Sequence, residues 1–499
     1  MIEVQPVNNS YIRILTEPSI FEELFEYFSF EKEIWVPNPK KPGKMKPKKV
    51  DFHLLSKRTQ FLPAGLYKHL LAFGKDRNYQ IKGADLPSEN HAVIDTQEYL
   101  AGLHLWAKGK YITAYDHQVD AITKALRYRR RTLLSSTSSG KSLIAYVISR
   151  FLVEKKELKG LIIVPTLNLV NQMYEDFRDY SAKNGWSTED NVHTIFAGKN
   201  KNTYKPIVIS TWQSIYELGD PDWYEQFDFV IGDEAHGFDA KCLGKLMNQL
   251  VNARYRIGMT GSLKDGRVHE LSVIGYFGPT VQVITNKEAI DKGIAAPVAI
   301  KSLVLKYKED ERAFVSNLGY REEIDWLIQH KQRNNFITNL SLSLKKNNLI
   351  LFQFVKKQGL ILYEILKQRN SGRPIYFVYG GTDAEDRERI RQIVEKEHDA
   401  IIIASNGVFS TGVSINNLHA IIFASPFKSK VRLLQSVGRG MRLHKTKTEL
   451  ELFDIIDDLY YVPEPGAEGR SNYALRHFLY RKKLYQREQF VVKVYHITL

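Results

Sequence analysis

The sequence predicts an α/β protein with two parallel-sheet domains in tandem, preceded by a small α+β domain. Short apolar runs alternate with helical patterns from about residue 130, and the alternation starts again after about residue 348. Such alternation implies parallel sheets, because each helix carries the chain back between two parallel strands. The first 95 residues lack the polar clusters that follow later strands. We therefore expect four parts, at residues 1–95, 96–288, 289–463 and 464–499.

The small first domain is predicted to contain a helix over 21–30 and short strands at 34–36 and 50–55. Residues 37–49 are too rich in Pro and Gly for regular structure, which favours a hairpin with a long basic loop. A disordered, solvated loop is the alternative, although such a loop can also become ordered on binding. Six lysines of this loop would lie across phosphates without reading bases: Lys40, Lys41, Lys44, Lys46, Lys48 and Lys49.

An anion-binding turn is predicted between an apolar run at 132–134 and a helical pattern at 143–153. The turn consists of small residues and ends in Gly140-Lys141-Ser142. A small-residue loop before a helix N-terminus directs backbone N–H groups and the helix dipole at a phosphate. Lys141 would reach the outer phosphates, and the Ser142 hydroxyl would bind Mg²⁺. Because Ser135 stands where the usual pattern has Gly, a Ser-rich surface turn is the alternative.

Polar residues directly follow four predicted strands of this domain. Open parallel sheets bind ligands along the edge where the carboxyl ends of the strands meet. We therefore expect these residues to gather beside the anion-binding turn. The four clusters are Pro165-Thr166, Ser210-Thr211-Trp212, Asp233-Glu234-Ala235-His236 and Thr260-Gly261-Ser262.

Two adjacent carboxylates, Asp233 and Glu234, stand at the mouth of the apolar strand 227–231. Charge is costly to bury there, so no structural need explains the pair. Asp233 can hold Mg²⁺ opposite Ser142. Glu234 can orient or deprotonate an attacking water. Together with the phosphate cradle, the pair predicts hydrolysis of a nucleotide.

The second α/β domain has predicted strands at 348–354, 374–378, 400–403 and 420–423, with helices at 359–367 and 383–396 between them. It has no Gly-Lys-Ser turn of its own. Arg439 and Arg442 lie at a loop–helix junction of this domain, where paired arginines suit bidentate phosphate recognition. Supplied from a neighbouring domain they would act as arginine fingers. The alternative is an ordinary surface arginine pair.

The tail, from about residue 463, combines basic and aromatic residues between 470 and 493. This pattern is consistent with a helix that packs on the second domain and shows a basic face to nucleic acid. A C-terminal helix with only a docking role is the alternative.

Composition agrees with a nucleic-acid partner. The net charge is +15, from 71 Lys and Arg against 56 Asp and Glu, which favours a polyanion. The single cysteine, Cys242, excludes an intramolecular disulfide and a Cys-based zinc site, and fits a reducing compartment. No secretory signal is visible, and residues 400–427 are too polar for a membrane span. We expect a soluble, cytoplasmic protein.

Taken in order, these clusters resemble the motif set of superfamily 2 helicases and translocases over about residues 112–442. The resemblance implies two RecA-like domains with ATP and Mg²⁺ in the cleft between them. The size of the chain, its lysine-rich first domain and the ending Gln435-Ser-Val-Gly-Arg-Gly-Met-Arg442 further resemble the recombination-associated DNA helicases of certain tailed bacteriophages. This second resemblance implies ATP-driven unwinding and branch migration of DNA junctions, stalled forks and RNA–DNA loops. Departures from the family pattern are Ser135, Ser436 and Thr260-Gly261-Ser262.

The resemblance also assigns a role to each cluster. ATP would be bound by Gln118, which would read adenine, and by Ser136, Thr137, Ser138, Ser139, Gly140, Lys141 and Ser142. Hydrolysis would depend on Lys141, Asp233, Glu234, Gln435, Arg439 and Arg442. ATP state would be coupled to domain movement by His236, Thr260, Ser262 and Gly412. The nucleic-acid track would include Thr166, Thr211, Trp212 and again Gly412.

Three other functions remain open: an RNA helicase, the motor subunit of a restriction system, and an architectural nucleic-acid binder that only senses nucleotide. The Asp233–Glu234 pair argues against the last, and no nuclease constellation supports the second. We expect a monomer that binds branched, forked or RNA–DNA hybrid substrates without sequence preference and with a steep salt dependence. Single-strand-binding or recombination proteins are the expected protein partners.

Overall fold

In the computed structural model the chain forms two compact units, and the predicted α/β fold class is confirmed. The first unit contains residues 1–135 and 140–283, and the second contains 136–139 and 284–499. No helix in the part of the chain that the structure describes is both long and apolar enough to cross a bilayer. The structure describes residues 1–37, 39, 45–83, 92–136, 139–196, 200–237, 240–369, 372–411 and 415–499.

The first unit begins with the small α+β domain, a mixed four-stranded sheet with two helices. The strand order is β5-β2-β1-β6, in which β1 is antiparallel to β2 and parallel to β6. Alternating apolar residues such as Ile2, Ile14 and Leu62 face the helices and are fully buried. The elements are β1 (Ile2–Pro6), β2 (Tyr11–Leu15), α1 (Pro18–Tyr27), β5 (Phe61–Pro63), α2 (Tyr67–Asp76) and β6 (Ile81–Gly83).

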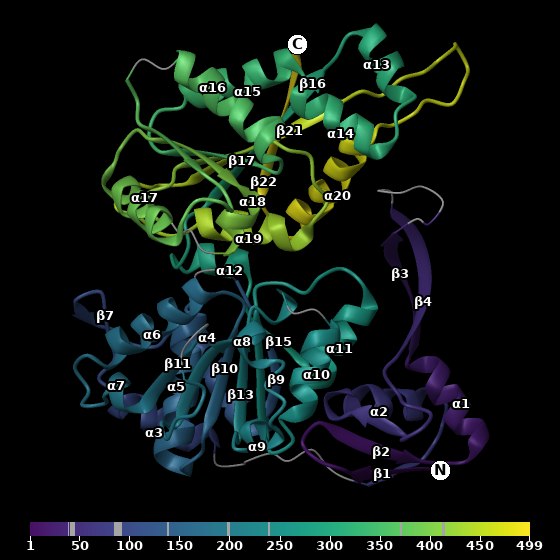
Figure 1. Ribbon diagram of the computed structural model, residues 1–499, viewed down its shortest axis with the longest axis vertical. Coiled ribbons are helices and arrows are strands. Elements are labelled where there is room, and N and C mark those ends of the chain that lie inside the picture. The colour runs from purple at the N-terminus through teal and green to yellow at the C-terminus, as the bar shows by residue number, and fades with distance from the viewer. Residues whose placement is uncertain are drawn as a thin grey trace. The chain divides into compact units, whose positions relative to one another are not determined.

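A two-stranded ribbon, β3 (Ser29–Pro37) with β4 (Met45–His53), extends from this domain (Figure 1). The expectation of irregular structure over 37–49 is therefore wrong for Pro37 and for residues 45–49. A ribbon leaves one edge of each strand unpaired, so even Pro47 is tolerated in β4. Lys46, Lys48 and Lys49 are exposed on this strand. The other three lysines of the predicted loop, Lys40, Lys41 and Lys44, lie outside the described residues.

The rest of the first unit is built around a seven-stranded sheet of order β11-β12-β10-β13-β14-β9-β15. The neighbouring pairs from β11 to β9 are parallel. Its strands are β9 (Arg130–Ser135), β10 (Gly160–Val164), β11 (Val192–Ile195), β12 (Ile207–Thr211), β13 (Phe229–Asp233), β14 (Tyr255–Thr260) and β15 (Thr280–Ile284). Its longer helices are α3 (Ala92–Gly102), α4 (Asp116–Tyr128), α5 (Lys141–Lys156), α6 (Leu167–Ser181), α10 (Ala240–Gln249) and α11 (Arg267–Phe277). Short elements are β7 (Trp106–Ala107), β8 (Lys110–Tyr111), α7 (Thr188–Asn191), α8 (Trp212–Ile215), α9 (Pro221–Glu225) and a 3₁₀ turn at Ala235–Gly237.

The small domain packs tightly on α11 and on the start of β14. Gly65 lies so close to α11 that a Cβ there would be 2.0 Å from the carbonyl oxygen of Ile274. The fully buried Arg256 donates to the Ser10 hydroxyl at 2.8 Å and to the carbonyl oxygen of Ala253 at 2.9 Å. Because a buried guanidinium must keep its hydrogen bonds, these contacts hold the small domain in place.

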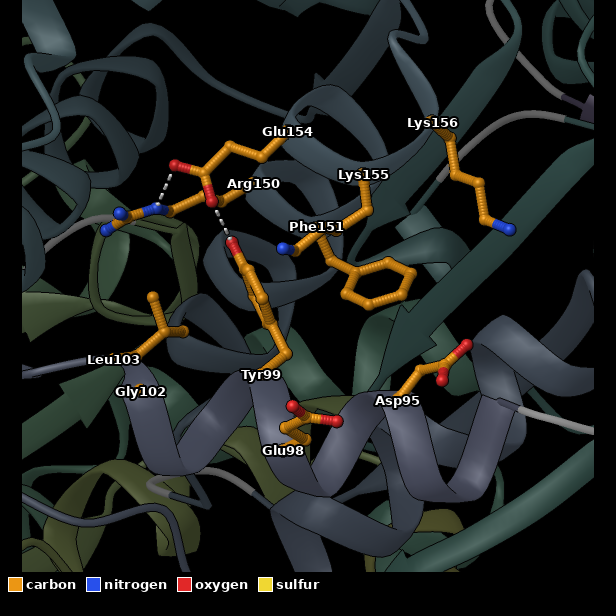
Figure 2. A pocket seen from close by; sticks show the side chains of 10 residues that line it. All are labelled: Asp95, Glu98, Tyr99, Gly102, Leu103, Arg150, Phe151, Glu154, Lys155 and Lys156. Carbon is orange, nitrogen blue, oxygen red and sulfur yellow. Dashed lines mark hydrogen bonds and ion pairs between the residues drawn. The ribbon is translucent and has the colours of Figure 1, made fainter.

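Helix α3 joins this sheet domain by a polar contact with α5 (Figure 2). The Tyr99 hydroxyl donates to Glu154 Oε2 at 2.6 Å, and Arg150 Nε donates to Glu154 Oε1 at 2.8 Å. A cavity of about 570 Å³ lies between the two helices, and Asp95 and Lys155 are also in its wall. None of the predicted site residues lines this cavity.

The second unit is built around another seven-stranded sheet, of order β18-β19-β17-β20-β21-β16-β22, with every neighbouring pair parallel. Its strands are β16 (Val298–Lys306), β17 (Asn348–Phe352), β18 (Ile375–Val378), β19 (Ile401–Ser405), β20 (Ala420–Phe423), β21 (Leu450–Asp458) and β22 (Val491–Thr498). Its helices are α12 (Asn286–Asp291), α13 (Glu309–Ser316), α14 (Tyr320–Gln329), α15 (Lys331–Ser343), α16 (Leu360–Arg369), α17 (Ala384–Lys396), α18 (Asn406–Thr411), α19 (Lys430–Gly440) and α20 (Tyr473–Arg487), with a π-helical turn at Val355–Gly359.

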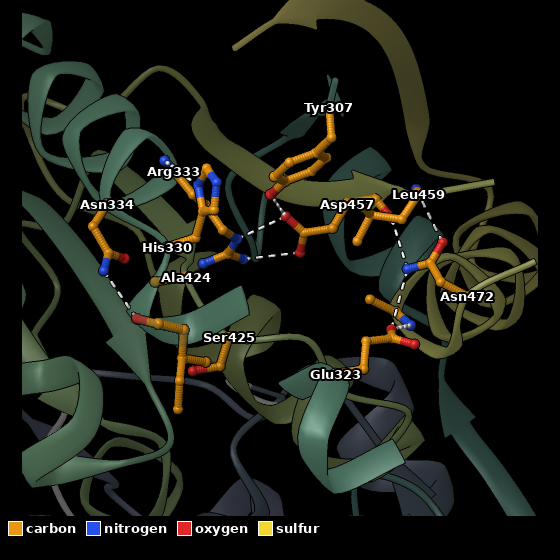
Figure 3. Close-up of polar contacts among 12 residues, drawn as sticks. Tyr307, Glu323, His330, Arg333, Asn334, Ala424, Ser425, Asp457, Leu459 and Asn472 are labelled. Atoms are coloured by element: carbon orange, nitrogen blue, oxygen red, sulfur yellow. Dashed lines mark hydrogen bonds and ion pairs between the residues drawn. The ribbon is translucent and has the colours of Figure 1, made fainter. Parts of the chain in front are cut away.

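Buried ion pairs hold the outer helices of the second unit to β21. Arg333 on α15 donates to both carboxylate oxygens of Asp457, and the Tyr307 hydroxyl donates to the same carboxylate at 2.7 Å (Figure 3). Arg481 on α20 forms the second pair, with Asp454 at 2.8 Å. Each carboxylate is fully buried. Loss of one partner would leave an uncompensated charge, so these pairs fix where the helices lie.

Candidate active site

The predicted anion-binding turn connects β9 to α5 at the C-terminal edge of the first sheet. Gly140 has a φ of +81°, a left-handed conformation that favours glycine. A Cβ at this position would lie 2.1 Å from Nε2 of Gln118. The Ser139 hydroxyl donates to the carbonyl oxygen of Ser136 at 2.7 Å, which closes the turn. Thr137 and Ser138 lie outside the described residues.

Gln118 lies in the first turn of α4, and its side chain is buried. Its Oε1 accepts the backbone N–H of Tyr115 at 2.9 Å, as in a capping box. This bond orients the amide group so that Nε2 faces Gly140. The structure thus places the glutamine that was expected to read a purine directly against the turn that was expected to bind phosphates.

The two reactive residues at the start of α5 have defined partners. Lys141 Nζ lies 3.9 Å from Glu234 Oε1, so the lysine reaches the carboxylate pair at the end of β13. The Ser142 hydroxyl lies 2.9 Å from the hydroxyl of Tyr180, near the end of α6. Tyr180 was not predicted, because no periodicity in the sequence relates residue 180 to residue 142.

Asp233 is the last residue of β13 and is almost completely buried. Burial, with a smaller contribution from the charge of Glu234, raises the pKa of Asp233 to about 7, and Lys141 opposes the shift. Perturbed carboxyl pKa values of this kind are common at catalytic sites. The following residue, Glu234, has a φ of +49°, which strains a residue with a side chain.

The residues around Asp233 fit a magnesium ion that also binds phosphates. Asp233 Oδ1 is buried and has no hydrogen-bond partner among the described residues. A buried, orphaned carboxylate oxygen is costly unless a cation or a donor occupies the space beside it. No cluster of three or more His, Cys, Asp and Glu in the described part of the chain could hold a metal by itself. Magnesium commonly takes one or two protein oxygens and completes its shell with water and phosphates.

The residues expected to couple nucleotide state to movement are in contact. His236 Nδ1 lies 2.6 Å from Oγ1 of Thr260, and the Thr260 hydroxyl donates to the carbonyl oxygen of Ser262 at 3.0 Å. His236 Nδ1 also lies 3.2 Å from Glu234 Oε2. A displacement of Glu234 would therefore move His236 and, through it, Thr260 at the end of β14. Gly412 lies outside the described residues.

The predicted nucleic-acid contacts of the first unit share one edge of the sheet. Thr166 precedes α6 and Thr211 ends β12, in parallel register with the end of β10. Thr211 is largely buried, and its hydroxyl lies 2.8 Å from that of Ser214. Trp212 is partly exposed, at the start of α8, where its ring contacts Tyr216.

In the second unit, Gln435 and Arg439 lie four residues apart on one face of α19, and Arg442 follows the helix. All three side chains are partly exposed. Ser436 is buried, with 1% of its surface exposed. An arginine at this position would have to be accommodated inside the domain, which gives a packing reason for the departure from the family pattern.

Known proteins match both units of the chain. The protein-family model named type III restriction enzyme, res subunit, matches residues 111–265. The family model named helicase conserved C-terminal domain matches residues 332–444. The chain is 32% identical over 497 residues to the ATP-dependent DNA helicase UvsW of Enterobacteria phage T4, with 96% of each chain covered. It is 20% identical over 377 residues to a type I restriction enzyme EcoAI endonuclease subunit of Escherichia coli, covering 68% of this chain and 45% of that one.

Comparison with solved structures gives the same result. The crystal structure of T4 UvsW superposes with a TM-score of 0.51 and 30% identity, over 100% of this chain and 99% of that chain. The likeness therefore includes the small N-terminal domain and the C-terminal tail, which the two family models do not reach. The chain belongs to the superfamily 2 helicases, in the family of the ATP-dependent DNA helicase UvsW.

Proposed function

We propose that this helicase unwinds and branch-migrates branched DNA: four-way junctions, forks and RNA–DNA loops. The observation that carries the proposal is similarity to a DNA helicase over 96% of both chains, the lysine-bearing small domain included. A ribbon with exposed lysines suits phosphate contact on a duplex, since it adds affinity without sequence preference.

The proposed chemistry at the first unit is hydrolysis of ATP. Gln118 binds the base, the 136–142 turn binds the phosphates, and Lys141 contacts the outer phosphates. Ser142 and Asp233 would hold Mg²⁺, which would neutralise phosphate charge. Glu234 orients the attacking water and accepts its proton. Arg439 and Arg442 are proposed to stabilise charge on the γ-phosphate, as arginine fingers do.

The proposed movement follows from differential binding. A nucleotide shifts a conformational equilibrium only if it binds one state better than the other. The chain of contacts from Glu234 through His236 to Thr260 and Ser262 gives a route from the phosphates to the sheet edge. We expect the same edge, with Thr166 and Trp212, to contact one strand of the substrate. The protein is proposed to act as a monomer. Single-strand-binding or recombination proteins are the proposed partners.

A panel of substrates tests the proposal. ATP turnover and strand separation are measured with linear duplex, forked DNA, four-way junctions, RNA–DNA loops and structured RNA at equal nucleotide concentration. The proposal expects junctions and forks to give the highest turnover, and ATP-dependent strand exchange at the junction. Highest turnover with structured RNA would contradict it and favour an RNA helicase.

A motor subunit of a restriction system is the second candidate, since one matching family model describes such a subunit. It predicts that strand separation by the purified chain is absent and that a nuclease partner is required. Coverage of 96% of UvsW, against 45% of the EcoAI subunit, favours the helicase.

A further inference from the structure

A surface cluster in the second unit brings cations and aromatic rings together beside α20. We call it the α20 cluster; its cations are Lys428, Arg432 and Arg476, and its rings are Tyr320, Tyr473 and His477. The ring centroid of Tyr320 lies 5.4 Å from that of Tyr473 and 5.5 Å from that of His477. Arg476 lies over the Tyr473 ring at 4.2 Å. Lys428, just before α19, lies over the ring of Tyr480 on α20 at 5.5 Å, and α19 itself packs on α20. The cluster therefore unites α14, the start of α19 and α20.

The α20 cluster lies at the edge of the second sheet where parallel strands end. Lys428 follows β20, and Arg432 Nη1 donates at 3.1 Å to Oε1 of Gln353, which follows β17. Sheets of this kind bind their ligands at this edge. Tyr473 and Arg476 lie in the tail that was expected to show a basic face to nucleic acid, whereas Lys428, Arg432 and Tyr320 were not among the predicted contacts.

Buried contacts fix the cluster before any ligand arrives. Glu323 of α14 accepts Asn472 Nδ2 at 3.1 Å and the backbone N–H groups of Tyr473 and Ala474, at the N-terminus of α20 (Figure 3). At the other end of the cluster, Arg481 Nη1 donates to the carbonyl oxygen of Phe427 at 2.6 Å. The loop that carries Lys428 is thereby tied to α20. Preorganised side chains lose little entropy on binding.

Within the described part of the chain, no carboxylate neutralises the cations of the cluster. Among the described residues, Lys428, Arg432 and Arg476 form no ion pair. Glu323, the carboxylate that binds the N-terminus of α20, is 1% exposed and accepts hydrogen bonds from Asn472, Tyr473 and Ala474. Burial, with the charges of Arg481, Lys428 and Arg476, lowers the pKa of His477 to about 4, which reports the positive potential here. Tyr320 remains 44% exposed.

We propose that the α20 cluster is a binding site for single-stranded DNA, in which Lys428, Arg432 and Arg476 contact phosphates and Tyr320 stacks on a base. Exposed aromatic rings beside uncompensated cations are the two components by which proteins bind single strands without sequence preference. This inference rests on the proposed action on DNA, and it adds a contact between DNA and the C-terminal helix α20. It would hold the displaced strand while the motor moves.

The test uses the full-length chain and two matched double variants. Lys428→Gln with Arg476→Gln removes two charges from the cluster, and Lys482→Gln with Lys483→Gln removes two exposed charges from the same helix outside it. Binding of a fluorescein-labelled oligo(dT) is measured by anisotropy over a range of KCl concentrations. We expect the cluster variant to lower the slope of log K against log [KCl] by about 1.4, because each phosphate contact on a single strand contributes roughly 0.7. The control variant should keep the wild-type slope.

Stacking is tested separately with Tyr320→Leu and Tyr320→Phe. Loss of the ring should weaken oligo(dT) binding about 5-fold to 160-fold, the range that corresponds to single base–aromatic stacks. Phenylalanine should restore binding to within about twofold of wild type. Equal slopes in the two double variants, or wild-type binding by Tyr320→Leu, would overturn the inference. Stimulation of wild-type ATP turnover by DNA is measured in parallel, so failure of the proposed function is seen independently.

Discussion

Replacement of Tyr180 by Phe removes one hydroxyl, and with it the hydrogen bond to Ser142. A serine hydroxyl has one proton and two lone pairs, so Ser142 can donate to Tyr180 while a lone pair faces a cation. Burial, and then the charge of Asp176, raise the pKa of Tyr180, so its oxygen carries its proton at neutral pH. Without this partner the Ser142 hydroxyl is free to rotate away from the metal. We therefore expect Tyr180→Phe to weaken binding of the magnesium complex of the nucleotide.

The size of the effect follows from one hydrogen bond. A typical bond contributes about 1 kcal/mol net, and about 1.4 kcal/mol corresponds to a factor of ten. Affinity for Mg²⁺·ATPγS should fall about fivefold, whereas affinity for ATPγS in EDTA should not change. Isothermal titration calorimetry with and without Mg²⁺ measures both values without any turnover.

Two controls separate an effect on the position of the Ser142 hydroxyl from a change in the packing of the aromatic cluster. Tyr146 belongs to the same aromatic cluster, 5.6 Å from the Tyr180 ring, but its hydroxyl accepts from Arg150. Tyr146→Phe should therefore leave the magnesium dependence unchanged. In a Ser142→Ala background, Tyr180→Phe should have no further effect. Equal weakening with and without Mg²⁺, or an additive double variant, would refute the reasoning.

Three further predictions concern other parts of the chain. Changing Lys46, Lys48 and Lys49 of β4 to Gln should lower the salt slope of duplex binding by up to about 2.7, since each phosphate contact contributes about 0.9; an unchanged slope would make the ribbon a bystander. Arg481→Ala leaves the Asp454 carboxylate buried with only the Tyr485 hydroxyl as a donor and no cation. It should lower the free energy of unfolding by about 3–5 kcal/mol in a denaturant titration; a loss below about 1 kcal/mol would contradict this. Burial, and then Lys346 and Lys447, lower the pKa of His419 to about 4. Between about pH 6.5 and 4 the unfolded state therefore binds a proton at His419 that the folded state does not, so the free energy of unfolding should fall as the pH is lowered through this range. The fall should be smaller in His419→Gln, and equal pH profiles for the two proteins would refute this prediction.

The contacts at the carboxyl ends of the strands could be predicted because they depend on local sequence. An apolar run followed by a polar cluster predicts both a strand and the edge at which its last residues lie. Glu234, His236 and Thr260 follow this rule, and the structure brings them together. The strands at 348–352, 375–378, 401–405 and 420–423 were found for the same reason.

Contacts between distant elements could not be predicted in this way. No pattern relates Tyr180 to Ser142, or Tyr320 to Tyr473, because these pairs meet only through the packing of helices. Strands β16 and β21 were missed, and so was the alternation of Val491–Thr498, which adds β22 to the sheet after a tail that was expected to be helical. In β4, cross-strand pairing outweighed a composition that favours irregular structure.

The most direct measurement of the central claim is ATP turnover by Lys141→Ala in the presence and absence of DNA. Lys141 is the residue through which the 136–142 turn meets the carboxylate pair. We predict that DNA-stimulated hydrolysis is lost while the affinity for a four-way junction stays close to that of wild type. Normal turnover by this variant would contradict the assignment of the nucleotide site, and with it the account of an ATP-driven motor.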